Sequence, residues 1–200
     1  MSHAFAARMF SDAAKTLQEQ AGSRRAYSRF DEAMPDSHQS GAMLGERERR
    51  LIAQRDSFYL GSVNPDGWPY IQHRGGPAGF ARILGPQTLA FADYRGNRQY
   101  ISTGNWQTND RVCLFMMDYA QRQRLKLLGR ASTIAASADP ALTMAIHDAA
   151  YAAEPERIVL IRVEAFDWNC PQHITPRYTQ EQIQKQMLER QTAHQQNAFT

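Results

Sequence analysis

The sequence contains a run of short strand-like segments at hairpin spacing, and this pattern constrains the fold more than any other feature. Apolar segments are separated by turn residues, and helices are inserted only at intervals. Such a run favours an antiparallel sheet, because parallel strands would need a crossover between each pair. We expect about seven strands, at residues 57–63, 68–74, 80–84, 88–93, 111–118, 124–133 and 157–168.

The turn Asn-Pro-Asp-Gly at residues 64–67 marks the clearest hairpin. Proline suits the first central position of such a turn, and glycine closes it. The segments 57–63 and 68–74 are its two strands. Together with the remaining strands they predict a mainly β fold with flanking helices, arranged as a closed or split antiparallel β-barrel.

Helices are expected at residues 2–20, 45–56, 140–151 and 179–196, and residues 22–42 read as an irregular connection. Ser2 and Asp139 are the expected N-caps of the first and third of these helices, and Gly22 ends the first. The predicted organisation is therefore a helical arm and connection over residues 1–50, a barrel over residues 51–175, and a C-terminal helix over residues 176–200 that packs on or beyond the barrel.

The composition suits a globular protein, with 42% hydrophobic and 22% charged residues. No apolar run approaches the roughly 20 residues of a membrane span, and the N-terminal residues lack the apolar core of a signal peptide. We therefore expect a cytoplasmic protein. Cys113 and Cys170 are far apart and show no metal-ligand spacing, so each is expected to be a single thiol and no metal site is predicted.

The candidate functional stretch is TLAFADYRGNRQYISTGN, residues 88–105. A strand over residues 88–93 runs into Gly96, which permits a turn with positive φ. Asn97 is then the expected N-cap of a short helix that opens on Arg98. Unpaired backbone N–H groups and the positive end of the helix dipole favour an anion there, and phosphate is the natural candidate.

Basic residues concentrate in the middle of the chain. Residues 71–130 hold nine Arg or Lys and three Asp or Glu, whereas the net charge of the whole chain is only +3. Such an excess can attract nucleic acid or a small phosphorylated ligand. No basic helix, zinc pattern or RNP-like aromatic strand accompanies it, so the small phosphorylated ligand is favoured and nucleic acid is not expected.

Several sequence blocks together resemble the pyridoxamine 5′-phosphate oxidase-like, FMN-binding split-barrel family. In order they are GWPYIQHRGGP, FADY followed by GNRQ, NDRVCLFMMD, RLKLLGRA and RVEAFDWNCPQHI. The resemblance spans about residues 51–174, and the order of the blocks is more specific than any single block. It implies an antiparallel split β-barrel that binds FMN and acts as an oxidoreductase on an unknown substrate.

In this family, basic and hydroxyl side chains of two strands hold the FMN phosphate, together with a Ser-Arg-Lys start to a short helix. The resemblance places Asn97, Arg98 and Gln99 at that tripeptide, so the arginine is retained and the lysine is replaced. The other cofactor-binding residues that it implies are Gln72, His73, Arg74, Arg82, Asp93, Tyr94, Arg124 and Trp168.

The resemblance also implies a homodimer with flavin between the subunits, in which the C-terminal strand of one subunit reaches the cofactor of the other. Phe166, Trp168 and Asn169 belong to that strand. The Arg-x-His element with which true pyridoxamine phosphate oxidases hold their substrate is not recognisable, and DWNCPQHI stands in its place. We therefore expect FMN binding without oxidation of vitamin B6.

Two other functions use the same phosphate site. One is a flavin-binding carrier or redox sensor without turnover, and the other is a binder of a different anionic ligand, such as heme or a deazaflavin. At the level of residues, Arg74 and Arg98 are either phosphate anchors, or surface arginines, or partners of Asp93 or Asp110 in ion pairs.

The histidines near the proposed site assign no catalytic residue. His73 can serve either in proton transfer or in structure, and the structural role is favoured. Cys170 and His173 lack an orienting third residue, so a nucleophile is not favoured there.

Overall fold

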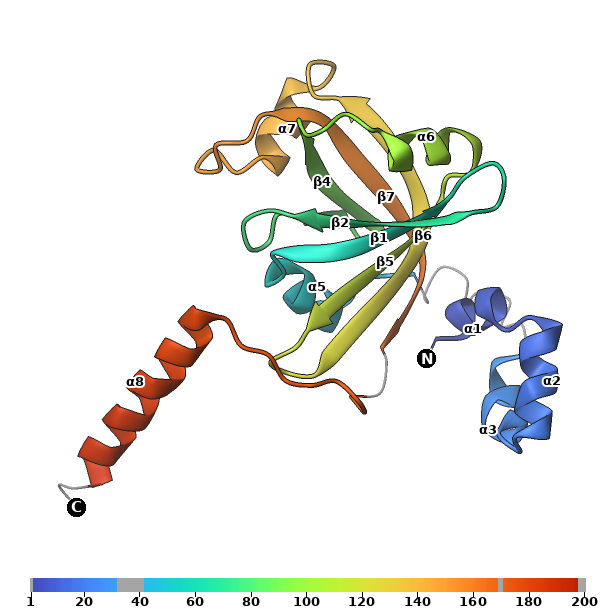
Figure 1. Ribbon diagram of the computed structural model, residues 1–200, viewed down its shortest axis with the longest axis horizontal. Helices are drawn as coiled ribbons and strands as arrows, with labels where there is room; N and C mark the ends of the chain where they lie inside the picture. Colours follow the sequence, from blue (N-terminus) through green and yellow to red (C-terminus); the bar gives the residue numbers. More distant parts are fainter. Residues whose placement is uncertain (1, 32–41, 169–170, 198–200) are drawn as a thin grey trace.

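The computed structural model describes residues 2–31, 42–168 and 171–197, and Figure 1 shows a curled sheet with helices around it. The strands within these residues form one sheet in the order β2-β1-β5-β6-β7-β4-β3, and all neighbours are antiparallel. The predicted mainly β, antiparallel barrel is thus confirmed. The strands are β1 (Ser57–Val63), β2 (Pro69–Gly75), β3 (Arg82–Gly85), β4 (Thr88–Tyr94), β5 (Arg111–Asp118), β6 (Gln123–Ala135) and β7 (Pro155–Trp168).

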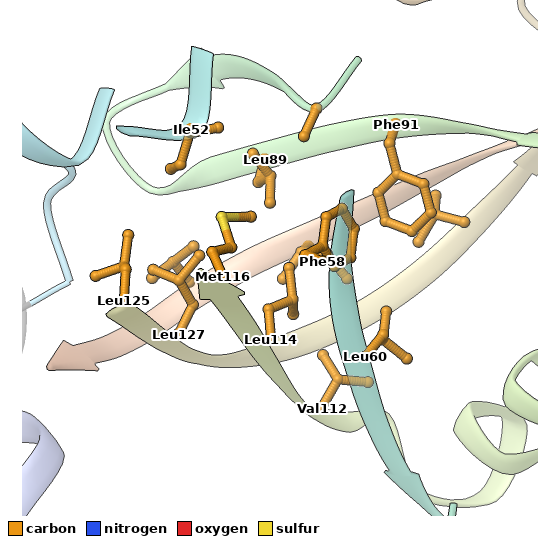
Figure 2. Packing of buried hydrophobic residues seen from close by; sticks show 14 of the residues in the cluster. Ile52, Phe58, Leu60, Leu89, Phe91, Val112, Leu114, Met116, Leu125 and Leu127 are labelled. Atoms are coloured by element: carbon orange, nitrogen blue, oxygen red, sulfur yellow. The ribbon is translucent and has the colours of Figure 1, made fainter. Parts of the chain in front are cut away.

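Alternating side chains of the strands point inward and meet in one apolar core. Strand β5 has a strictly alternating burial pattern, as expected for a strand with one face in the core. Figure 2 shows side chains of β1, β4, β5 and β6 converging on the same space, joined by Ile52 from α5. Since strands distant in the sheet order share this core, the sheet is curled around it.

The two edges of the sheet approach each other at a seam. The pairing of β3 with β4 ends at Ala90, so among the described residues positions 91–94 of β4 have no partner strand on that side. Arg74 of β2, at the opposite edge of the sheet, forms an ion pair with Asp93 near the end of β4. A polar contact rather than a backbone ladder therefore joins the two edges there.

The helices differ from the predicted ones chiefly in where they begin and end. The first predicted helix is broken in two, because Ser11 leaves the helical conformation and its hydroxyl accepts a hydrogen bond from the Ala14 N–H (3.2 Å). The cap at Ser2 and the left-handed stop at Gly22 are confirmed. The helices are α1 (His3–Met9), α2 (Asp12–Gln20), α3 (Arg24–Tyr27), η1 (Ser28–Phe30), α5 (Glu46–Ala53), α6 (Ile101–Thr108), α7 (Pro140–Ile146) and α8 (Gln180–Asn197).

Two further expectations about helices need correction. The connection expected at residues 22–42 contains α3 and η1, while its part at 32–41 lies outside the described residues. Helix α7 ends at Ile146 rather than at residue 151, because His147 turns to extended backbone and the Asp148 carboxylate accepts the Ala150 N–H (2.9 Å) in a local turn. Its predicted cap, Asp139, is confirmed.

The helices lie around the barrel in different ways. Helix α7 covers the outer face of β4 and β7 through Ile146, and α6 places Trp106 in the core at one end of the barrel. Helix α8 extends away from the barrel in Figure 1. No helix in the described part of the chain has the length and hydrophobicity that a membrane crossing requires.

Candidate functional site

A cleft opens at the seam of the barrel, between β2, the end of β4 and the start of α6. Its free volume is about 70 Å³. Three successive inward positions of β2 form one wall, and the turn after β4 forms another. The lining residues are Tyr70, Gln72, Arg74, Asp93, Tyr94, Gly96, Asn97, Arg98, Gln99, Tyr100, Ile101, Ser102, Thr103 and Glu156.

The turn that leads into α6 is built differently from the predicted one. The helix begins at Ile101 instead of following Asn97, and Gly96 is not among the residues with positive φ. Arg98 (φ 59°) and Tyr100 (φ 52°) take the left-handed conformation instead. The side chain of Asn97 accepts the Gln99 N–H (3.2 Å), which makes a local turn and not a helix cap.

The N-terminus of α6 faces the cleft with its backbone donors available. Tyr100 occupies the N-cap position, and its side chain makes no capping hydrogen bond. The first residues of the helix, Ile101, Ser102 and Thr103, all line the cleft. Because the N–H groups of a first helical turn have no intrahelical acceptor, this end of the cleft is suited to an anion.

A buried group of charges lies at the cleft, which Asp93 and Arg74 line and where Arg157 contacts Asp93. Asp93 and Arg157 lie opposite each other in the β4–β7 pairing, and Arg157 Nε is 3.4 Å from Asp93 Oδ2. The other carboxylate oxygen of Asp93 accepts a hydrogen bond from Arg74 Nη1. The side chains of Asp93, Arg74 and Arg157 are only 11%, 14% and 15% exposed, so water screens these charges weakly.

A second carboxylate holds the outer side of Arg157. Glu156 Oε2 is 2.8 Å from Arg157 Nη2, and Glu156 Oε1 accepts a hydrogen bond from the Tyr100 hydroxyl (2.6 Å). These hydrogen bonds, the one from Tyr100 first, lower the pKa of Glu156. The guanidinium of Arg157 also lies 4.4 Å from the centre of the Tyr100 ring, so the left-handed turn is fixed to the strand.

Tyr94 links the cleft to helix α7. Its hydroxyl is 3.5 Å from His147 Nδ1, and its ring contacts those of His147 and Tyr151. Burial, followed by the charges of Tyr151 and Asp148, raises the pKa of Tyr94. Its hydroxyl therefore keeps its proton at neutral pH and can donate a hydrogen bond.

The cleft brings together most of the cofactor-binding residues that the sequence predicts. They are Gln72, Arg74, Asp93, Tyr94, Asn97, Arg98 and Gln99.

Four predicted residues lie elsewhere. His73 points to the opposite face of β2, where its ring meets Tyr59 at 5.8 Å, and Arg82 is exposed on β3. Trp168 and Arg124 also lie outside the cleft.

Trp168 packs at the far end of the barrel. Its Nε1 donates to Glu48 Oε1 (2.5 Å), and the Arg47 guanidinium is 3.8 Å from the centre of its ring. Arg157 and Trp168 are at opposite ends of β7, about 35 Å apart at the rise of an extended strand. One chain therefore does not bring Trp168 to the cleft, and Asn169 and Cys170 lie outside the described residues.

Several cleft residues were missed by reasoning from the sequence. Tyr70 could have been found by extending the alternation of β2 from Gln72 and Arg74. The hydroxyls of Ser102 and Thr103 lie within the candidate stretch, but the expected helix start after Asn97 precedes the observed start at Ile101. Glu156 reaches the cleft, and Arg157 reaches Asp93 beside it, only through the pairing of β7 with β4, which no local pattern reveals.

This fold and cleft agree with a match to a known family. The family model described as pyridoxamine 5′-phosphate oxidase matches residues 44–169, which include the whole sheet and the cleft. The chain therefore belongs to the pyridoxamine 5′-phosphate oxidase-like family of FMN-binding split barrels. No curated protein matches the sequence.

Solved structures of low sequence identity are similar to the barrel. HupZ of Group A Streptococcus is 14% identical with a TM-score of 0.47, over 67% of this chain and 99% of its own. A Clostridium acetobutylicum protein related to general stress protein 26 is 13% identical with a TM-score of 0.46, over 64% and 88%. An FMN-binding protein of Syntrophomonas wolfei is 11% identical with a TM-score of 0.47, over 76% and 97%.

The residues of the cleft fit the phosphate end of FMN. Arg74 and Arg98 supply cationic donors, Thr103 supplies a hydroxyl, and the first turn of α6 supplies backbone N–H groups. The Nε of Arg74 is buried without a hydrogen-bond partner among the described residues. The cleft is too small for the flavin ring, since pockets for small molecules usually hold about 300–1,000 Å³.

Proposed function

We propose that this protein binds FMN through its phosphate in the seam cleft and is an FMN-dependent oxidoreductase. The observation that supports this most directly is the uncapped start of α6, which faces the same cleft as Arg74 and Arg98 in a member of this family. When bound, FMN supplies hydride or electron transfer. The residues of the chain hold and orient the phosphate and place charge around it.

A homodimer with the flavin between its subunits belongs to this proposal. The cleft of one chain can hold a phosphate but not a whole flavin. Arg124 and Trp168, which the family resemblance connects with the flavin, lie outside the cleft of their own chain. Both features are explained if the end of β7 from a second copy covers the mouth of the cleft.

Reconstitution with FMN and with riboflavin tests the proposed cofactor. We expect purified protein to show flavin absorption bands, or to acquire them with FMN, and to bind riboflavin at least about tenfold more weakly because riboflavin lacks the phosphate. Equal affinity for FMN and riboflavin would place the phosphate elsewhere. A heme or deazaflavin spectrum in the purified protein would instead identify the alternative cofactor.

The same cleft would serve a flavin carrier or sensor that does not turn over. Anaerobic addition of NADH or NADPH to the FMN-loaded protein, followed by oxygen or another acceptor, separates the two functions. An oxidoreductase reduces and reoxidises its flavin over many cycles. A carrier shows at most one slow reduction, no faster than that of free FMN.

We expect pyridoxamine 5′-phosphate to give no turnover above the enzyme-free control. An oxidase of this compound needs a second anion site for the phosphate of its substrate. The segment after β7 supplies no cation before Arg177, whose guanidinium is stacked 4.9 Å from the centre of the Tyr119 ring. Anaerobic flavin reduction by stoichiometric pyridoxamine 5′-phosphate would contradict this expectation and point to Arg177 or Arg124 as the missing anchor.

A further inference from the structure

The best-positioned cation of the seam cleft already has an anionic partner from the protein itself. Arg74 binds one oxygen of the Asp93 carboxylate, and Arg157 is 3.4 Å from the other. All three side chains are largely buried, being only 11% to 15% exposed. Asp93 is thus held on both sides in the place where a bound anion would meet Arg74.

The backbone fixes Asp93 more firmly than it fixes Arg74. Asp93 faces Arg157 within the β4–β7 ladder, whereas Arg74 comes from β2 across the seam, where no ladder joins the strands among the described residues. Among the described residues, the buried Nε of Arg74 also has no hydrogen-bond partner. Its guanidinium can therefore exchange one acceptor for another without breaking a backbone ladder of the sheet.

The charges that line the cleft cancel. Arg74 and Arg98 are positive, while Asp93 and Glu156 are negative, and Glu156 is engaged by Tyr100 and Arg157. A phosphate monoester carries about −1.5 to −2 charges and three strong acceptor oxygens. An anion of this kind gains most from the cleft when Arg74 is released from Asp93.

We propose, on the basis of the phosphate site proposed above, that Asp93 is an internal ligand that Arg74 exchanges for the phosphate of the cofactor. The carboxylate is attached to the chain, so its effective concentration beside Arg74 is on the order of millimolar or higher. A free monoanion such as acetate or chloride offers no more charge than Asp93 and competes poorly. A phosphate monoester offers more charge and more acceptors, so the exchange selects phosphate.

A simpler role for Asp93 predicts the opposite result. If Asp93 only orients Arg74 for the ligand, removing its charge weakens phosphate binding, because the arginine loses its position. If Asp93 competes with the ligand, removing its charge strengthens phosphate binding and lets smaller anions bind.

The test compares Asp93→Asn with wild type and with Asp118→Asn. Asp118 is a matched control, because it forms a 2.9 Å ion pair with Arg55 at similar burial, 9% and 14% exposed, outside the cleft. Thermal unfolding is followed against inorganic phosphate and against acetate at constant ionic strength. We expect Asp93→Asn to reach half of its maximal stabilisation at a phosphate concentration lower by about tenfold or more, which is the change in affinity that one charge-assisted hydrogen bond gives. We also expect acetate to stabilise this variant. Asp118→Asn should match wild type in both titrations.

An unchanged or higher phosphate requirement in Asp93→Asn would overturn the proposed exchange. Wild type provides a second measurement that does not depend on the folding of the variant, because phosphate should stabilise it while acetate at the same concentration should not. Equal stabilisation of wild type by the two anions would also overturn the exchange. FMN titration of wild type reports separately on the proposed function: if FMN fails to bind while the phosphate results hold, the flavin assignment falls and the exchange at an anion site remains.

Discussion

Arg98 and Arg74 line the same cleft but are held very differently. Arg74 is 14% exposed and paired with Asp93, whereas Arg98 is exposed on the left-handed turn before α6. A substitution of Arg74 would disturb the seam as well as the binding of any ligand. Arg98 is therefore the cleaner residue with which to test phosphate binding.

We expect Arg98→Ala to weaken FMN binding by about 1.5 kcal/mol, the lower end of the range for a charge-assisted hydrogen bond because the side chain is exposed. The melting temperature should not change. Titration of FMN by fluorescence measures the affinity. Arg95→Ala is the control, because Arg95 is a neighbouring exposed arginine that does not line the cleft. Wild-type affinity in Arg98→Ala would remove Arg98 from the site.

Substitution of two glycines, Gly129 in β6 and Gly104 in α6, is expected to change stability in opposite directions. A Cβ on Gly129 would lie 2.6 Å from the Arg162 carbonyl oxygen and 2.9 Å from Ile161 Cγ2, whereas a Cβ on Gly104 meets nothing within 4 Å. Gly129→Ala should therefore destabilise the protein by about 2–3 kcal/mol through overpacking. Gly104→Ala, in the interior of α6, should stabilise it by about 0.5–1 kcal/mol. Urea unfolding measures both, and equal effects of the two substitutions would contradict the local geometry.

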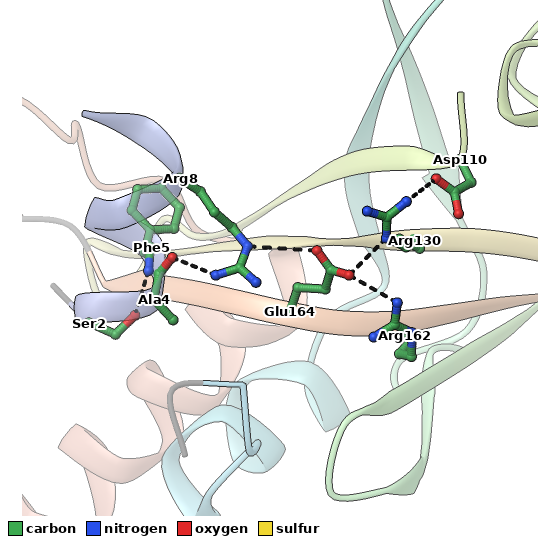
Figure 3. A network of polar contacts seen from close by, with 8 residues as sticks. All are labelled: Ser2, Ala4, Phe5, Arg8, Asp110, Arg130, Arg162 and Glu164. Carbon is green, nitrogen blue, oxygen red and sulfur yellow. Dashed lines mark hydrogen bonds and ion pairs between the residues drawn. The ribbon is translucent and has the colours of Figure 1, made fainter. Parts of the chain in front are cut away.

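At the level of elements, one irregularity of the sheet attaches the N-terminal helix to the barrel. The pairing of β6 with β7 shifts so that Leu128 faces Ala165 while Gly129 faces Val163, which leaves Glu164 as the extra residue of a bulge. Figure 3 shows its carboxylate among three arginines from α1, β7 and β6. They are Arg8 (3.6 Å), Arg162 (3.0 Å) and Arg130 (2.8 Å).

Glu164 should stabilise the protein in a pH-dependent way. Burial acts to raise the pKa of Glu164, but the hydrogen bond and charge of Arg130 and the charges of Arg162 and Arg8 outweigh it, so the pKa is lowered. A carboxylate with a lowered folded-state pKa stabilises the protein above its unfolded pKa of about 4.3, and this stability is lost as the pH falls through the folded value.

We therefore expect Glu164→Gln to cost about 1–2 kcal/mol at pH 7 and progressively less below about pH 4. Urea unfolding at neutral and at acidic pH measures this. The control is Glu46→Gln, since Glu46 and its partner Arg50 are both 73% exposed and the pair should contribute under about 0.5 kcal/mol. A cost of Glu164→Gln that is the same at both pH values would show that packing, and not charge, is responsible.

At the scale of the whole molecule, the isolated chain exposes apolar side chains to solvent on the hairpin of β1 and β2, the strand that lines the cleft. On the outer face of the β1–β2 hairpin, Tyr59 is 43% and Ile71 is 69% exposed. The cleft itself encloses only about 70 Å³. A second copy could cover both the apolar face and the open mouth of the cleft.

We expect a homodimer of twice 22.7 kDa in sedimentation equilibrium at micromolar concentration. Ile71→Lys should shift the protein toward the monomer, because a charge is costly to bury in an apolar interface. The far-ultraviolet circular dichroism of this variant, compared with that of wild type, shows whether the barrel itself has been disturbed. A wild-type protein that stays monomeric with FMN bound would exclude a flavin site shared between subunits.

The sequence by itself determined the strands and their order along the chain. The alternation of apolar residues and the turn residues between strands are signals that span only a few positions. Strands β1 and β5 therefore begin and end at the predicted residues, Ser57–Val63 and Arg111–Asp118. The predicted helix ends are less accurate. Side chains such as Ser11 and Asp148 accept hydrogen bonds from nearby backbone N–H groups, and these bonds compete with those of the helix. The candidate stretch was also found locally, since it combines a strand, a turn and basic residues within residues 88–105.

Only the tertiary structure decided which charges meet. Asp93 lies between Arg74 and Arg157 because the sheet curls until β2 reaches β4 and because β7 pairs with β4 in one register. Neither event leaves a periodic signal in the sequence, since both depend on contacts between residues far apart in the chain. The length of β7 carries Trp168 away from the cleft that its own chain forms, because Arg157 and Trp168 lie near opposite ends of that strand. Local patterns therefore located the turn proposed to bind an anion, while the closure of the barrel determined what surrounds it.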